Sequence, residues 1–411
     1  MILISEIKLL QNEYFQFYKW KLFPTESQKD YIDKSIEMYD YIYNWAYGIE
    51  EENYSKYLIG LAKYKLLSNY TMYNLLSEFR KENDYVGNFN VDTERGAIDT
   101  LILAYKYWFN SNMRNNRPKP RTKENTTNSF HTRSDRFHIY NDKVRISGLE
   151  PRSNTIELKF NSGFTGHEKC FNPTINRDNL NNYWVGFSIV LPKPVINNFP
   201  KTEAIGIDIS SRSDARLVLS NGMRFIEHPK YRRALQNISK SDSNLKYYNE
   251  KKINTERSRN EIRDLEIYRK RYKYLTNLTL DFYYKAINFI INLNPQGIVI
   301  EDLNVVAMLR KHYIADDIFH AQFGTFKELM KYNCNKYGIP LYLAPKEFNS
   351  SNICSCCGKL NKDSDNKIFR CNYCGFELDR DLNAAINLKE LYYPKSVFYK
   401  TSPNIINLYE L

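Results

Sequence analysis

Five of the seven cysteines of this chain lie close together, between Cys354 and Cys374. They include two C-x-x-C pairs with thirteen residues between the pairs, and a glycine follows each pair. Two such pairs at this separation are typical of a zinc site with four thiolate ligands. A secreted protein held by disulfides would spread its cysteines along the chain. The clustering therefore indicates a metal site in a reducing compartment.

This stretch offers five cysteines for four ligand positions. The second cysteine of each pair precedes a glycine, which lets the backbone turn toward the metal. The expected zinc ligands are therefore Cys354, Cys357, Cys371 and Cys374. Cys356 would be a bystander, and Cys170 and Cys334 ordinary thiols. Four thiolates leave no open coordination position, so we expect a structural zinc ion.

Acidic residues interrupt or end three other segments of the second half of the chain. The apolar run 204–209 contains Asp208, the run 297–301 ends in Glu301, and a helix begins at residue 379 among acids. An acid at the end of a buried strand costs free energy unless it is paired, protonated or bound to a cation. One such acid is usually structural, but three that arrive from two strands and a helix N-terminus favour a common cation site.

The order of the predicted elements gives these acids a fold. Two apolar runs joined by Asn221-Gly222 predict a β-hairpin after the first acidic strand. The whole order, strand–strand–strand–helix–strand–helix, matches a ribonuclease-H-like fold, whose carboxylates converge on two divalent cations. Two cations about 4 Å apart activate water and stabilise the leaving oxygen of a phosphodiester. Carboxylate ligands suit Mg²⁺ or Mn²⁺.

The first half of the chain predicts a strand, then helices, then short strands. Residues 14–23 alternate aromatic and polar side chains, as a strand does. Thr25 can cap a helix with Gln28 at the capping-box position, and helical periodicity continues to about residue 112. Short strands dominate residues 138–191, and the prolines that follow indicate a linker.

The net charge of +12 comes mainly from two stretches. Residues 230–276 hold 14 basic and 6 acidic side chains, and their lack of glycine and proline predicts one long helix. Residues 114–136 hold 7 basic and 2 acidic side chains, and two prolines make them an extended linker. A solvated charged helix and a plain linker are the ordinary interpretations, and contact with nucleic-acid phosphates is the alternative. The candidate contacts are Arg117, Lys119, Arg121, Lys123, Arg133, Arg136, Lys251, Lys252, Arg269, Lys270 and Arg271.

Taken together, these motifs resemble those of the TnpB proteins, which are encoded by insertion sequences and are similar to the compact type V CRISPR effectors. The resemblance rests on Gly-Ile-Asp208, Val-Ile-Glu301-Asp302-Leu-Asn, the paired C-x-x-C-Gly motifs and Asp-Arg-Asp381-Leu-Asn-Ala-Ala-Ile-Asn. It implies that Asp208, Glu301 and Asp381 are the catalytic acids and hold Mg²⁺ or Mn²⁺, with Asp379 as the competitor for the last place.

The resemblance also implies a multidomain chain with α/β and all-β parts. Residues 1–200 would be a nucleic-acid recognition half, in which the strands of a β-barrel-like wedge domain (1–22 and 120–200) enclose a helical insertion (23–119). Residues 201–411 would be a RuvC-like nuclease domain. We expect in it a helical insertion at about 230–293 and an inserted zinc ribbon at about 348–378.

The implied activity is that of an RNA-guided DNA endonuclease of a transposable element, with a guide RNA and double-stranded target DNA as partners. A CRISPR-associated effector of the same fold and an RNA-guided repressor that binds without cutting are the alternatives. The presence of all three acids argues against the repressor. No apolar run approaches the roughly 18 residues of a membrane span, and the N-terminus lacks the basic start of a signal peptide. We therefore expect no membrane partner and a bacterial-type cytoplasmic, nucleoid-associated location.

Overall fold

The structure is a computed structural model of the whole chain, and it divides into two compact units, Met1–Pro192 and Lys193–Leu411. Each unit is described by itself. The described residues are 12–111, 113, 116–122, 125–149, 154–194, 201–210, 216–250, 258–303, 319–362, 367–394, 404–406 and 408–409. Within these ranges, no helix has the length and apolar character needed to cross a membrane.

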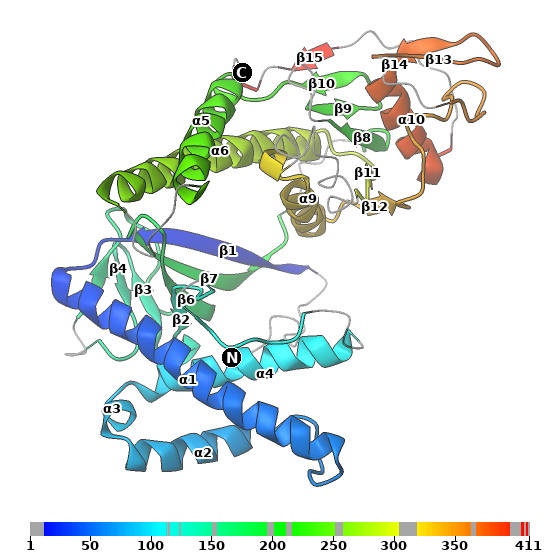
Figure 1. The fold of residues 1–411 in the computed structure, drawn as a ribbon. Coiled ribbons are helices and arrows are strands. Elements are labelled where there is room, and N and C mark those ends of the chain that lie inside the picture. The colour runs from blue at the N-terminus through cyan, green and yellow to red at the C-terminus, as the bar shows by residue number, and fades with distance from the viewer. Residues whose placement is uncertain are drawn as a thin grey trace. The chain divides into compact units, whose positions relative to one another are not determined.

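The N-terminal unit contains two antiparallel sheets (Figure 1). The larger has the strand order β1-β7-β6-β2, and the smaller has the order β3-β4-β5. The strands are β1 (Glu13–Leu22), β2 (Ser129–His131), β3 (His138–Tyr140), β4 (Lys143–Arg145), β5 (Ile156–Glu157), β6 (Phe171–Arg177) and β7 (Tyr183–Pro192). The first strand after the N-terminus thus pairs with the last strand of the unit. The barrel-like closure expected for a wedge domain stays a prediction.

Four helices follow β1 in the chain: α1 (Glu26–Leu58), α2 (Asn69–Glu82), α3 (Asp84–Gly87) and α4 (Val91–Asn110). The predicted capping box of α1 is confirmed, because the Thr25 hydroxyl accepts the Gln28 N–H and the Gln28 side chain accepts the Thr25 N–H. The Gln28 amide also donates to the carbonyl of Thr155, next to β5. This hydrogen bond links the first turn of α1 to the segment that leads into β5.

Two strand predictions in this unit differ from the structure. Within the range 138–191, for which short strands were predicted, residues 155–160 contain only the two-residue strand β5, and Lys159 has a positive φ of 58°, outside extended geometry. The strand β6 was not predicted, because Pro173 interrupts its pattern. The register of β6 against β7 shifts between Phe171 and Thr174, so the proline lies at a bulge, where strands tolerate it.

The C-terminal unit is built on a sheet of order β12-β11-β8-β9-β10-β15 (Figure 1). Its strands are β8 (Ile205–Ile209), β9 (Leu217–Leu219), β10 (Met223–Phe225), β11 (Ile298–Glu301), β12 (Leu341–Ala344) and β15 (Asn404–Ile406). The strands β8, β11 and β12 are parallel, and β9 is antiparallel to both of its neighbours. The predicted hairpin at Asn221-Gly222 is confirmed as the β9–β10 connection. The strand β15 was not predicted.

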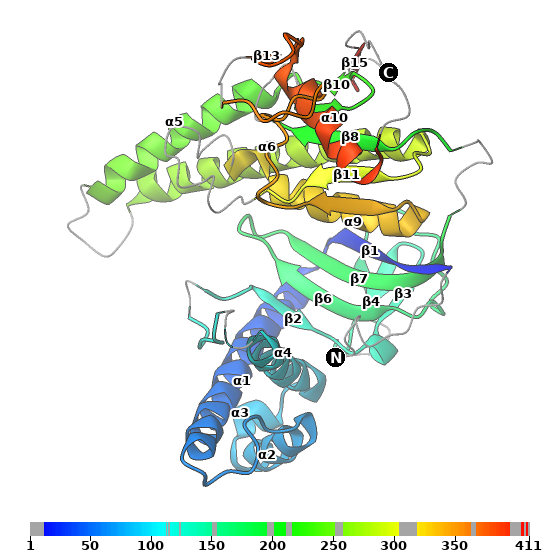
Figure 2. The ribbon, with the colours of Figure 1, turned by 90° about the vertical axis from the view of Figure 1, so that its right-hand side faces the viewer.

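Helices cover both faces of this sheet. α6 (Arg259–Asn292) and α9 (Phe323–Tyr337) lie on one face and α10 (Arg380–Tyr392) on the other, while α5 (Tyr231–Glu250) packs on α6. Ile205 and Ile207 of β8 pack with α6 and α9, whereas Val299 of β11 packs with Leu388 of α10 on the opposite face. Figure 2 shows α10 crossing in front of the strands. Alternate residues of β8 and β11 therefore face α10.

The helical insertion is two helices rather than the predicted long one. α5 ends at Glu250 and α6 begins at Arg259, and the two pack against each other through Ile238 and Leu275. The Ser258 hydroxyl accepts the N–H of Glu261, which caps α6. Serine three residues before glutamate is a helix-start pattern. The sequence therefore marks the start of α6 by a capping serine, although the segment contains no glycine or proline.

Candidate active site and metal centre

The three predicted acids come from adjacent elements of the C-terminal unit. Asp208 lies in β8 and Glu301 ends β11, and the register pairs Ile207 with Ile300 immediately before them. The two acids are thus neighbours on parallel strands. Ile207 and Ile300 pack against α6 and α9. Because successive side chains of a strand point to opposite faces, Asp208 and Glu301 lie on the other face, which α10 covers. Asp381 lies in the first turn of α10.

Burial raises the pKa values of Asp208 and Glu301, and neighbouring charges add to the rise at Asp208. Asp208 keeps only 8% of its surface exposed. Its pKa is raised well above the ordinary value, first by loss of hydration and then by the charges of Glu301 and Asp381, while Arg380 opposes the rise. Burial also raises the pKa of Glu301, and a hydrogen bond from Ser350 opposes it. The three carboxylates form one electrostatic cluster, which a cation or a proton would relieve.

Asp379 and Asp381 have different surroundings, although they lie two residues apart. Asp379 is the N-cap of α10, and its carboxylate accepts the N–H groups of Asp381 and Leu382 at 3.1 Å each. It also lies 3.1 Å from the guanidinium of Arg224. Asp379 is therefore occupied in holding the helix start. Both carboxylates raise the pKa of Asp208, and Asp381 does so more strongly than Asp379. This arrangement favours Asp381 as the third acid.

Asp302, next to Glu301, stands outside this cluster. Its carboxylate is 2.8 Å from the ammonium group of Lys327 on α9, and this hydrogen bond lowers the pKa of Asp302. The neighbouring acids of β11 thus have opposite environments. Glu301 is partly buried beside Asp208, and Asp302 is paired with a cation.

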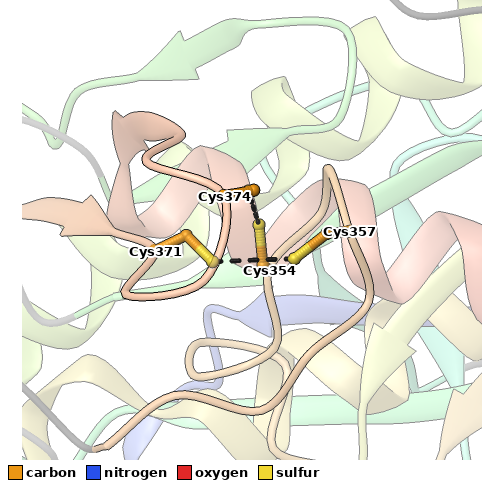
Figure 3. Close-up of side chains that lie close together, drawn as sticks. All are labelled: Cys354, Cys357, Cys371 and Cys374. Carbon is orange, nitrogen blue, oxygen red and sulfur yellow. Dashed lines mark hydrogen bonds between the residues drawn. The ribbon is translucent and has the colours of Figure 1, made fainter.

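The four predicted zinc ligands converge on one point (Figure 3). The Sγ atoms of Cys354 and Cys374 lie 3.7 Å apart, those of Cys357 and Cys371 lie 3.6 Å apart, and all four lie within 4.8 Å of one another. A tetrahedral site with Zn–S bonds of about 2.3 Å has S–S edges of about 3.8 Å. The donor set and its spacing therefore fit zinc.

The backbone around the cysteines is also arranged for thiolates. Gly358 and Gly375 have positive φ values of 72° and 71°, and each N–H donates to the carbonyl of the first cysteine of its pair. Burial alone would raise the pKa of the Cys371 thiol, but hydrogen bonds from backbone N–H groups lower it to about 6. Cys356 lies outside the cluster, as expected. Among the described residues, this is the single group of three or more potential ligands whose donor atoms all lie within 4.8 Å of one another. The carboxylates stand further apart.

The structure leaves the predicted basic contacts dispersed, with one stretch in each unit. In the N-terminal unit, Arg117 lies 2.7 Å from Glu51, and Arg121 lies 2.6 Å from Asp40. Arg133 forms an ion pair with Asp135. Arg136 approaches Asp92 at 3.5 Å, whereas Lys119 is exposed. Arg133 also lines a cavity of about 520 Å³ between α4 and the strands β2 and β6.

In the C-terminal unit, the candidates Arg269, Lys270 and Arg271 lie on α6. Lys270 pairs with Glu266 one turn away, and Arg271 donates to the Ser241 hydroxyl of α5 at 2.6 Å. Part of the positive charge of α5 and α6 is thus taken up by contacts within this pair of helices. The remaining candidates, Lys123, Lys251 and Lys252, lie outside the described residues.

Sequence reasoning missed one side chain that contacts the acid cluster. Ser350, between β12 and the first cysteine pair, donates its hydroxyl to the Glu301 carboxylate. A single serine in a connecting segment carries no sequence signal of this contact.

Comparison with known proteins agrees with these features. A family model described as "Cas12f1-like, TNB domain" matches residues 323–388. A protein of Streptomyces pristinaespiralis named "Putative RNA-guided DNA endonuclease" is 23% identical over 380 residues, which cover 90% of this chain and 88% of that protein. "TnpB-like protein L79" of Acanthamoeba polyphaga mimivirus is 29% identical over 160 residues, which cover 38% of this chain and 28% of that protein.

A solved structure shares the fold. It is the "Cryo-EM structure of the Cas12f1-sgRNA-target DNA complex", with a TM-score of 0.57, 15% identity, and coverage of 89% of this chain and 83% of that one. The strand order and this likeness define a RuvC-like nuclease fold, which confirms the ribonuclease-H-like prediction. These comparisons support the resemblance to the TnpB family that the motifs indicated.

Proposed function

We propose that this protein is an RNA-guided DNA endonuclease that cuts target DNA at a single RuvC-like site. The observation that carries the proposal is the cluster of Asp208, Glu301 and Asp381 at the ends of β8 and β11 and the start of α10. Asp208 and Asp381 are buried, and Glu301 is partly buried. Support also comes from the Streptomyces relative, which bears this name and aligns over most of both chains. The solved structure of similar fold contains guide RNA and target DNA, which are the partners we propose here.

The three carboxylates would hold two Mg²⁺ or Mn²⁺ ions. Such ions, when bound, activate the attacking water and stabilise the leaving oxygen of the phosphodiester. The chain itself contributes rigid placement, because two parallel strands and a capped helix carry the ligands. The oxygen-only donor set fits these hard cations. Burial, which raises the pKa of Asp208, would also strengthen the attraction between its carboxylate and a bound cation, because water screens the two charges less there than at the surface.

The test begins with the RNA that co-purifies with the full chain. The RNA is sequenced, and cutting of a matching DNA duplex is measured with Mg²⁺. We expect Asp208→Ala, Glu301→Ala and Asp381→Ala to abolish cutting while guided binding persists, because each removes a cation ligand. Asp379→Ala is the comparison. It removes the helix cap, worth about 1 kcal/mol, and should lower stability while cutting remains.

Two outcomes would contradict this assignment. Cutting retained by the Asp381 variant and lost by the Asp379 variant would exchange the roles of the two acids. RNA-guided binding by the unaltered chain without any cutting would support a repressor instead.

We further propose that the cysteine cluster holds a structural zinc ion. Cys371→Ser should release zinc, because it removes one of four ligands, and should lower the unfolding temperature. Cys356→Ser is the matched control, since this cysteine lies outside the cluster. Elemental analysis of the purified variants measures the zinc content. Equal zinc in both variants would refute the site.

A further inference from the structure

The turn that leads from β12 to the first cysteine pair contacts the acid cluster. Ser350 lies in this turn with only 2% of its surface exposed, and its hydroxyl donates to Oε1 of Glu301. The turn is tight, because the N–H groups of Asn352 and Ile353 both donate to the carbonyl of Asn349. The position of the Ser350 hydroxyl is therefore fixed by local backbone geometry.

Two asparagines of α10 hold the same turn from the other side. The Asn387 amide donates to the carbonyls of Ser350 and Ile353, at 2.8 and 2.6 Å. The Asn383 amide donates to the carbonyl of Ile353 at 2.8 Å, and its oxygen accepts the N–H of Ser355 at 3.0 Å. Asn383 and Asn387 are four residues apart and share one face of the helix. Both are buried, so their hydrogen bonds link the turn to the helix out of contact with water.

This network joins three parts of the site. α10 carries Asp381, β11 carries Glu301, and the turn carries Ser350 and runs into the zinc ligand Cys354. A buried carboxylate with free rotation about its last bonds would adopt several orientations. A single hydrogen bond from an anchored donor selects one of them, and outer hydrogen bonds of this kind orient metal ligands in general.

We propose that Ser350 is a positioning residue for Glu301: its hydroxyl holds Oε1 and so presents Oε2 to the divalent cation. The two asparagines of α10 set the position of Ser350 itself. This inference rests on the proposed function, because it assumes that Glu301 is a cation ligand. The competing view is that the hydrogen bond merely satisfies a buried carboxylate, and that view predicts no change in cation affinity.

The test measures Mn²⁺ binding to the full chain by electron paramagnetic resonance. We expect Ser350→Ala to weaken Mn²⁺ binding by about 10- to 100-fold, the usual effect of losing an outer hydrogen bond to a metal ligand. Ser350→Thr, which keeps the hydroxyl, should restore much of the affinity. Ser35→Ala is the matched control, because Ser35 is also buried but donates only to a carbonyl of its own helix, α1. It should bind Mn²⁺ like the unaltered chain.

Cutting assays add a second readout. Ser350→Ala should lower kcat by about 10- to 100-fold at fixed Mg²⁺ and leave the KM for DNA largely unchanged, because it alters the orientation of a cation ligand and removes no basic side chain. Zinc content and the unfolding temperature report whether the variant is folded. If Ser350→Ala loses zinc, the isosteric pair Ser350→Thr and Ser350→Val isolates the hydroxyl instead, and equal Mn²⁺ affinity within that pair overturns the proposal.

The outcomes separate this inference from the proposed function. Normal Mn²⁺ affinity in Ser350→Ala, with weakened affinity in Glu301→Ala, overturns the positioning role alone. Normal affinity in both variants overturns the cation site as well.

Discussion

Buried acids outside the site show how strongly one side chain can respond to its surroundings. Glu50 lies on α1 of the N-terminal unit with 1% of its surface exposed. Its Oε2 accepts the N–H of Leu67 at 3.2 Å, whereas Oε1 has no hydrogen-bond partner among the described residues. Burial raises the pKa of Glu50 to about 7, and the Leu67 N–H offsets only part of the rise. The folded chain therefore retains a proton that the unfolded chain loses in mild acid.

This difference makes stability depend on pH. Because the folded-state pKa is raised, the stabilisation is complete below the ordinary glutamate pKa and is lost as pH rises through about 7. Glu50→Gln removes the titration. We expect the variant to match the unaltered chain at about pH 5 and to exceed it in free energy of unfolding by roughly 2 kcal/mol at about pH 8. Urea unfolding at both pH values measures this, and an identical pH dependence for the two proteins would contradict it.

At the same scale, the candidate residues of the site could be named from the sequence, and the catalytic roles of the acids stay predictions. The four cysteines and the acids at strand ends carry local signals, namely their spacing and their apolar neighbours. The choice of Asp381 over Asp379 came from the family motif Asp381-Leu-Asn-Ala-Ala and stays a prediction. The physical difference between the two acids has no local signal, because both stand at one helix start. It depends on Arg224, which is distant in the sequence and reaches Asp379 only in the folded chain. The contact of Ser350 with Glu301 is hidden for the same reason.

Among the elements, α10 depends on one glycine of β8. A Cβ atom at Gly206 would lie 2.0 Å from the carbonyl oxygen of Ala385 and 2.6 Å from the backbone nitrogen of Lys389. Both atoms belong to the backbone of α10, so no side chain can move aside. The close approach sets the distance between the helix that carries Asp381 and the strand that carries Asp208.

We expect Gly206→Ala to displace α10, to lower the free energy of unfolding by more than about 3 kcal/mol, and to abolish cutting. Gly324→Ala is the matched control. Gly324 lies in α9 with no atom within 4 Å of its added Cβ, so alanine there should be neutral or stabilise by about 0.5–1 kcal/mol. Thermal unfolding and cutting assays on both variants give the comparison. Similar stability for the two would show that α10 tolerates displacement.

Element prediction succeeded where a local signal was strong and failed where tertiary context decided. The capping box at Thr25 and the Asn221-Gly222 hairpin are local, and both were confirmed. β6 was missed because it is stabilised by its pairing with β7 and holds a proline at a bulge. The start of α6 had a local signal, Ser258 three residues before Glu261. The prediction of one long helix missed it, because it relied on the charged composition and the lack of glycine and proline. Composition is thus a weaker guide to helix length than capping residues.

For the whole molecule, the net charge of +12 pointed to a polyanionic partner, but the structure shows that the basic side chains are not equivalent. The Arg121 side chain is 10% exposed, lies 2.6 Å from Asp40, and stacks over Tyr43 with 4.4 Å between guanidinium and ring centre. It joins α1 to the basic linker. Lys119, two residues earlier, is exposed. The linker therefore combines a structural anchor with a cation in solvent.

These two cations should respond differently to substitution. Lys119→Ala should weaken binding of the co-purified RNA and reduce the slope of log affinity against log salt by about 1, the value for one lost phosphate contact, without a change in stability. Arg121→Ala should instead lower the free energy of unfolding by about 1–3 kcal/mol, because it leaves the partly buried Asp40 without its counter-ion and with only the hydrogen bond from Thr126. RNA binding at several salt concentrations, together with thermal unfolding, tests both. A reduced salt slope for Arg121→Ala at unchanged stability would show that the Asp40 pair opens and that Arg121 binds RNA directly.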